Sequence, residues 1–90
     1  MIKFPSELTI AQVDEYKVSI LSEIDELEVI ELDDSDLERI DTIGVQFILA
    51  VVTYIHAQGK QLEWSSSSIA FKDSLSQLGI TDDIVMQYVN

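Results

Sequence analysis

The segment Val45–Ala57 constrains the fold more than any other, because apolar residues occur on almost every side of it. Only Gln46, Thr53 and His56 interrupt it. A helix with one apolar stripe faces a core, whereas a helix that is apolar on most sides must be enclosed or must meet a partner. The segment is also too short and too polar to span a bilayer. We therefore expect a helix at about residues 43–58.

Two apolar stripes run along this expected helix. One consists of Val45, Ile48, Val52 and Ile55, and the other of Phe47, Ala50, Val51 and Tyr54. We expect one stripe to pack against the core. The other stripe is either covered by neighbouring elements or forms a docking face, and the sequence leaves both alternatives open.

Short apolar patterns predict strands on both sides of this helix. They occur near residues 2–10, 27–32 and 60–64. Pro5 cannot donate a hydrogen bond to a ladder, so the first strand is expected at an edge or with a bend. The imperfect alternation of residues 27–32 favours an interior strand that is covered on both faces.

Three further helices are indicated by spacing and by capping residues. Apolar residues at three- and four-residue intervals predict a helix of about four turns that begins after Thr9. A helix that ends at Gly79 should follow the serines at 65–68, and a short one should follow Thr81. Strands separated by helices imply parallel crossovers, so the fold class is α/β. Ninety residues make one domain, 1–90, with one core.

The net charge of −12 restricts the partners of the chain. Of the 17 acidic residues, all but Glu63, Asp73, Asp82 and Asp83 lie within residues 1–42. Such a surface repels nucleic-acid backbones and anionic lipid, so we expect no nucleic-acid binding and no direct membrane insertion. The charge serves either solubility or steering toward a basic face of a protein partner.

The residues Asp41-Thr42-Ile43-Gly44 stand where the acidic segment meets the apolar helix. This Asp-Thr-x-Gly sequence resembles the switch motif of STAS domains, the anti-sigma-factor-antagonist family. The order of elements around it is similar too, and the resemblance covers nearly the whole chain. It implies a STAS-like layered fold, with a small mixed sheet of about four strands and three to four helices.

The resemblance also implies a site. The hydroxyl residue directly after the Asp is the phosphoacceptor of the family, which corresponds to Thr42 here. A helix N-terminus offers free N–H groups and the positive end of the helix dipole, so a phosphate could be held there. The alternative is that Thr42 only caps the helix. The expected partner-binding residues are Asp41, Thr42, Ile43, Gly44, Val45 and Phe47.

By the same resemblance, the domain would be a non-enzymatic protein-interaction switch. Its partner would be a serine/threonine kinase-type anti-sigma factor or a histidine-kinase-like signalling protein, which includes chemotaxis machinery. An alternative partner is the ATPase of a bacterial phospholipid-transport ABC complex, in which the domain would be a constitutive accessory subunit. Phosphorylation of Thr42 would distinguish the signalling switch from the constitutive subunit, because only the switch requires it.

The remaining candidate residues indicate neither a catalytic site nor a metal site. His56 is the only histidine and is expected at the surface near a helix C-terminus. The run Asp33–Asp36 lacks the Gly and the terminal Glu of a calcium loop, so it is interpreted as a solvated loop. The serines at 65–68 suit a loop and a cap. We therefore expect no enzyme activity, no cofactor and no metal. Because no segment resembles a signal peptide, the expected location is cytoplasmic.

Overall fold

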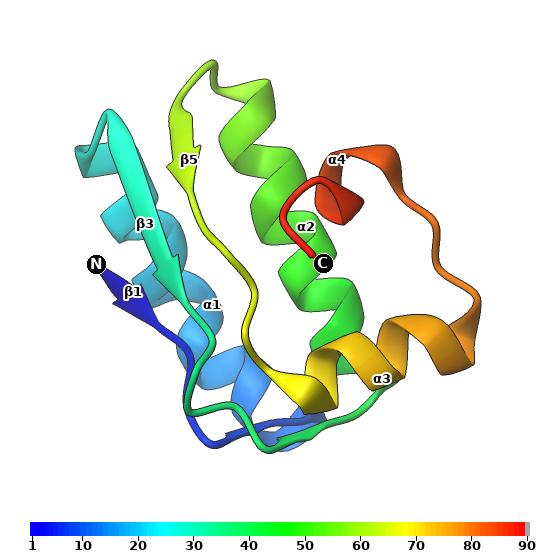
Figure 1. Ribbon diagram of the computed structural model, residues 1–90. Coiled ribbons are helices and arrows are strands. Elements are labelled where there is room, and N and C mark those ends of the chain that lie inside the picture. The colour runs from blue at the N-terminus through cyan, green and yellow to red at the C-terminus, as the bar shows by residue number, and fades with distance from the viewer. Residues whose placement is uncertain (90) are drawn as a thin grey trace.

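The computed structural model describes residues 1–89, which form two small parallel sheets and four helices (Figure 1). In chain order the elements are β1 (Ile2–Lys3), β2 (Glu7–Leu8), α1 (Ile10–Glu26), β3 (Val29–Asp33), β4 (Arg39–Ile40), α2 (Thr42–Ala57), β5 (Gln61–Glu63), α3 (Ile69–Leu78) and α4 (Asp83–Met86). The α/β class is confirmed, and the architecture is consistent with a STAS-like layered fold.

The sheet differs in detail from the single mixed sheet of about four strands that was expected. One sheet has the order β1-β3-β5, a second contains β2 and β4, and all the described pairs are parallel. The break falls at residues 4–6 in the first expected strand, where Pro5 lacks a backbone N–H. On the neighbouring chain segment, the turn at residues 34–38 separates β3 from β4.

Helix α2 lies in the middle of the molecule, with its first apolar stripe fully buried and its second stripe buried in part. It packs against α1, β5, α3 and α4. Its buried residues are Gly44, Val45, Phe47, Ile48, Val51, Val52 and Ile55. Of the second stripe, Phe47 and Val51 are buried, Tyr54 is half-buried and Ala50 is exposed. Neighbouring elements therefore cover most of this stripe, which is one of the two alternatives expected, and this enclosure accounts for the largely apolar character of the helix.

Only one face of the three-stranded sheet is covered by helices, which lie behind it in Figure 1. In β3, Ile30 and Leu32 are buried, whereas Val29 is 44% exposed and Glu31 is exposed. The expectation that this strand is covered on both faces is therefore wrong. The strand alternates as a half-buried strand does, with Val29 as an apolar residue on its open face.

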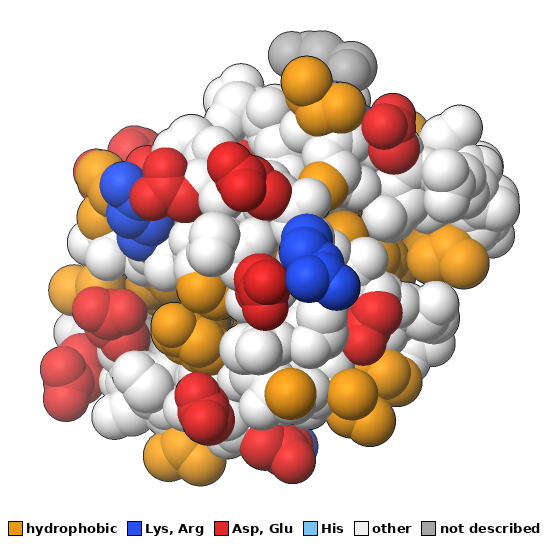
Figure 2. Space-filling model, turned by 90° about the horizontal axis from the view of Figure 1, so that it is seen from below, with side chains coloured by type: hydrophobic (Ala, Val, Ile, Leu, Met, Phe, Trp, Pro, Cys, Tyr) orange, Lys and Arg blue, Asp and Glu red, His pale blue; other side chains and the backbone are white. Residues whose placement is uncertain are grey.

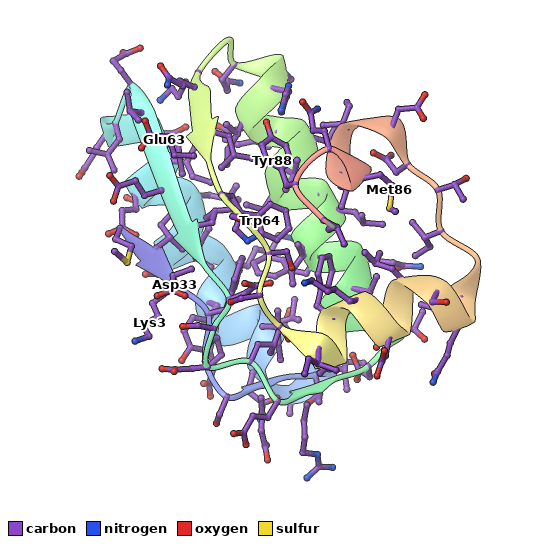
Figure 3. The ribbon with its side chains drawn as sticks, viewed as in Figure 1. Lys3, Asp33, Glu63, Trp64, Met86 and Tyr88 are labelled. Atoms are coloured by element: carbon purple, nitrogen blue, oxygen red, sulfur yellow. The ribbon has the colours of Figure 1, made fainter. Side chains whose placement is uncertain are left out.

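The segment after β5 is held by the end of the described chain (Figure 3). Trp64 stacks on Tyr88, with ring centroids 5.6 Å apart, and packs on Phe71 at 5.8 Å. The backbone N–H of Ser66 donates to the Tyr88 carbonyl over 2.9 Å, and the Tyr88 hydroxyl lies 2.9 Å from Nε2 of His56. His56 is exposed in the last turn of α2, as expected, and bonds to an aromatic side chain there.

The carboxyl ends of β1, β3 and β5 point to the same edge of the molecule, the lower edge in Figure 1. Helices α1 and α2 begin at this edge, and α3 crosses it. The face that is seen from below in Figure 2 therefore combines the starts of two helices with the loops that follow the strands. The motif at residues 41–44 belongs to this face.

Candidate functional site

Asp41 joins the N-termini of two helices. Its Oδ1 accepts a hydrogen bond from the Gly44 backbone N–H over 2.8 Å, which makes Asp41 the N-cap of α2. Its Oδ2 accepts from the backbone N–H of Ile10, the first residue of α1, over 2.9 Å. These bonds, first from Gly44 and then from Ile10, hold the pKa of the Asp41 carboxyl below its usual value.

Gly44 is required by a close approach of backbone. A Cβ atom at this position would lie 2.0 Å from the Leu8 carbonyl oxygen and 2.7 Å from Cγ1 of Ile40. Helix α2 therefore begins directly against the β2–β4 pair, and only glycine permits this spacing. Gly44 is buried, so its part in the motif is to place the helix start rather than to touch a partner.

Thr42 is the exposed first residue of α2. It lines a surface hollow of about 210 Å³ together with Asp41 and Ile40 from its own segment. The opposite wall comes from α3 and consists of Ser74, Gln77 and Leu78. Helix α3 therefore lies beside the motif, which no local sequence pattern indicated. Leu78 is 45% exposed in this wall.

The six expected partner-binding residues separate into exposed and buried sets. Thr42 and Ile43 are exposed, and Asp41 is half-buried. Gly44, Val45 and Phe47 are buried in the core. The structure therefore does not present the side chains of Val45 and Phe47 to a partner, because they belong to the inward faces of α2. Their burial in the free domain argues against the direct contact with a partner that was expected of them.

Exposed apolar side chains lie beside Thr42. Ile43 is 40% exposed, and Leu78 is exposed in the shared hollow. Ile10 is 66% exposed, and its backbone is fastened to the same carboxylate that caps α2. Figure 2 shows that hydrophobic side chains are interspersed with acidic ones across this face. The set Ile10, Thr42, Ile43 and Leu78 is called the Thr42 surface below.

The acidic run after β3 is not a wholly solvated loop. Asp34 is fully buried, and its carboxylate accepts from the Ser66 hydroxyl over 2.6 Å and from the Ser67 N–H over 2.9 Å. The interpretation of this residue as solvated is therefore wrong. Ser68 caps α3 by accepting from the Phe71 N–H over 3.1 Å, which confirms the expected cap.

Within residues 1–89, no cluster of acidic or histidine side chains is placed to hold a metal ion. No helix in this part of the chain is long and apolar enough to cross a membrane.

The family model of the STAS domain matches residues 1–89. The chain belongs to the STAS domain family. A search among curated proteins finds no significant match. STAS domains are generally non-enzymatic modules that bind other proteins, and the family includes the anti-sigma-factor antagonists.

Proposed function

We propose that this STAS domain is a cytoplasmic protein-interaction switch that docks a kinase-type signalling partner on the Thr42 surface. One observation carries the proposal. Asp41 provides the cap of α2, so the Thr42 hydroxyl is exposed without being needed for capping. The alternative in which Thr42 only caps the helix loses its physical basis, because the capping position is already filled. An exposed hydroxyl at a helix start is accessible to a kinase.

The electrostatics of the Thr42 surface favour regulation by phosphate. Phosphorylation would add about −1.5 to −2 charges at the start of α2. The positive end of the helix dipole can stabilise this charge within the domain. A partner that packs on Ile10, Ile43 and Leu78 would instead have to desolvate a dianion in the centre of its contact. Phosphorylation should therefore weaken docking without unfolding the domain.

Substitutions of Thr42 test this surface. We expect Thr42→Trp to abolish docking and Thr42→Glu to weaken it, whereas Thr42→Ala should bind about as well as wild type. A coupling of about 1–3 kcal/mol corresponds to roughly 5- to 150-fold in affinity. Glu carries one charge where phosphothreonine carries nearly two, so its effect should lie at the low end. The partner is first identified by cross-linking in its native host, and the affinities are then measured by titration with the purified partner.

Thr53 provides a matched control in the same helix. It is also an exposed threonine of α2, but it lies three turns from Thr42, toward the other end of the helix. Thr53→Trp and Thr53→Glu should leave docking unchanged. Equal docking by folded Thr42→Trp and wild-type protein would refute the assignment of the surface.

Mass spectrometry of the protein from its native host tests the regulatory step. We expect phosphate on Thr42 that depends on the partner kinase. Docking that survives Thr42→Glu, with no phosphate on Thr42 under any condition, would argue against the switch. That result would favour the constitutive accessory subunit of a phospholipid-transport ABC complex, in which Thr42 is a contact residue only.

A further inference from the structure

A second and larger hollow lies on the same edge of the molecule as the Thr42 surface. Its volume is about 440 Å³, and it separates the loop after β3 from the first two turns of α3. Leu37 and Glu38 line it from the loop, and Ile69, Ala70 and Asp73 line it from α3. The two hollows are consecutive along α3, because residues 69–73 border the larger one and residues 74–78 border the one beside Thr42.

The walls of this larger hollow are fixed by buried hydrogen bonds. Asp34 accepts from Ser66 and Ser67, so the loop after β3 is tied to the segment before α3. The hydroxyl of Ser68 donates to the Leu37 carbonyl over 2.8 Å, which ties the same two segments a second time. Buried and satisfied polar contacts of this kind hold a surface in one shape. The hollow is therefore pre-organised rather than formed on binding.

Two carboxylates line the hollow, and neither takes part in an ion pair among the described residues. The two ion pairs within residues 1–89 join Lys3 to Asp36 and Arg39 to Glu7, so neither Glu38 nor Asp73 takes part in one. Both of these carboxylates are exposed, and neither accepts a hydrogen bond from the described residues. No basic side chain lines the hollow.

Apolar surface accompanies these two carboxylates. Ile69 is 73% exposed at the rim, and Ala70 lies beside it. An isolated exposed apolar residue needs no explanation. Here, however, it adjoins two unpaired carboxylates from different elements, and Ser35 and Ser67 add further acceptors to the lining. This combination suits a long side chain that has an apolar stem and a cationic head with several donors.

We infer that the larger hollow receives an arginine side chain from a protein partner. The stem packs on Ile69 and Ala70, and the guanidinium group donates to Glu38 and Asp73. Arginine fits better than lysine, because its planar group presents five N–H donors to acceptors on two walls. The inference rests on the proposed function in that it assumes a protein partner on this face. It adds the chemistry of that partner, whose chain would follow α3. The arginine would lie about one and a half helical turns along α3 from the group that contacts Thr42.

The test uses a small probe and therefore does not depend on the identity of the partner. The uniformly ¹⁵N-labelled domain is titrated with Nα-acetyl-arginine methylamide, and the amide shifts are followed by NMR. The lysine analogue and the neutral citrulline analogue serve as comparison probes. We expect saturable shifts centred on Glu38 and on residues 69–73, with a dissociation constant on the order of millimolar. The lysine probe should bind more weakly, and the citrulline probe should cause no localised shift.

A pair of variants with the same change in net charge completes the design. Glu38→Gln/Asp73→Asn should weaken the arginine probe by about tenfold or more. Glu23→Gln/Glu26→Gln removes two exposed carboxylates from the far end of α1 and should change nothing. The amide spectra themselves report whether each variant is folded.

Three results would overturn the inference. They are shifts spread evenly over the acidic surface, equal binding of the arginine and citrulline or lysine probes, and binding unaffected by Glu38→Gln/Asp73→Asn. The titration involves neither Thr42 nor the partner. Its failure would leave docking at Thr42 intact, and failure of the Thr42 assay would leave the arginine selectivity of the hollow intact.

Discussion

A single carboxylate sets the position of two helices at the residue scale. Asp41 is 31 positions away from Ile10 in the chain, yet its two oxygens bond the first turns of both α1 and α2. The N–H groups of a first helical turn have no partner within the helix and must be satisfied from outside. Asp41 satisfies one such group in each helix, and so it holds Ile10 beside Thr42 on the proposed docking surface.

Substitution of Asp41 should therefore destabilise the fold in a pH-dependent way. Asp41→Ala should lower the free energy of unfolding by about 0.5–2 kcal/mol at neutral pH, the usual range for an N-cap. The pKa of this carboxyl is lower in the folded state than its ordinary value of 3.8. Its stabilisation is thus present above that value and is lost as the pH falls through the lower folded pKa.

Urea unfolding of wild type and Asp41→Ala at neutral pH and in acid measures both effects. The difference in unfolding free energy should shrink as the pH falls below 3.8. Glu23→Ala is the control, because it removes an exposed carboxylate that has no hydrogen bond among the described residues. A difference that stays constant into acid would show that the carboxylate charge contributes nothing.

How much of the site could be predicted from the sequence depends on how far apart in the chain the contacting residues are. The cap by Asp41 and its hydrogen bond to Gly44 span three residues, so a local pattern of Asp and Gly at a helix start could have indicated it. The bond to Ile10 and the burial of Asp34 depend on segments that are about 30 residues apart. Nothing in the local pattern distinguished Asp34 from its solvated neighbours.

At the scale of elements, the buried carboxylate of Asp34 fastens two loops that no strand pairing joins. It bridges the loop after β3 to the segment between β5 and α3, which carries Ser66 and Ser67. Asp34→Ala would leave the buried Ser66 hydroxyl without its acceptor and would remove the bond from the Ser67 N–H. A lost partner of this kind costs about 1–3 kcal/mol. We therefore expect a lower midpoint in chemical unfolding and looser walls around the larger hollow.

Asp36 is the matched control for Asp34. It belongs to the same acidic run, but it is exposed and pairs with Lys3 over 3.2 Å on the surface. Exposed pairs contribute about 0–1 kcal/mol, so Asp36→Ala should hardly change stability. Hydrogen exchange of the amides of residues 66–68 gives a second measurement. Exchange should accelerate in Asp34→Ala and remain slow in Asp36→Ala, and equal behaviour of the two variants would contradict the bridging role.

The helices were more predictable than the sheets, for a physical reason. The central helix was expected at residues 43–58 and runs from Thr42 to Ala57, because its caps and apolar spacing are local features. Strand pairing joins distant segments, and short strands leave little pattern to count. The division into two parallel sheets follows from the break around Pro5 and from the turn after β3, neither of which sets a register alone.

At the scale of the whole molecule, the charge of −12 on a body of 33 × 27 × 19 Å should limit stability. The Debye length is about 30 Å at 0.01 M salt and about 8 Å at 0.15 M. At the lower concentration, carboxylates repel one another across the entire domain, and at the higher one only neighbours do so. The two described ion pairs are exposed and contribute little to stability, so salt removes little favourable attraction when it screens them. We expect the melting temperature to rise with sodium chloride over this range. In a domain of this size each kcal/mol of relief raises it by about 4–8 °C.

Calorimetry of wild type and a charge-reduced variant measures this repulsion. Glu15→Gln/Glu23→Gln/Glu26→Gln neutralises three exposed carboxylates of α1. This variant should melt at a higher temperature than wild type in low salt and respond less to added salt, because part of its repulsion is already gone. A melting temperature that falls with salt in both proteins would mean that favourable charge contacts, such as the cap at Asp41, outweigh the repulsion. The contribution of these contacts to stability would then explain the retained charge. A melting temperature that rises with salt would show that the charge destabilises the fold, so its benefit would lie outside stability, in solubility or in the attraction of a basic partner.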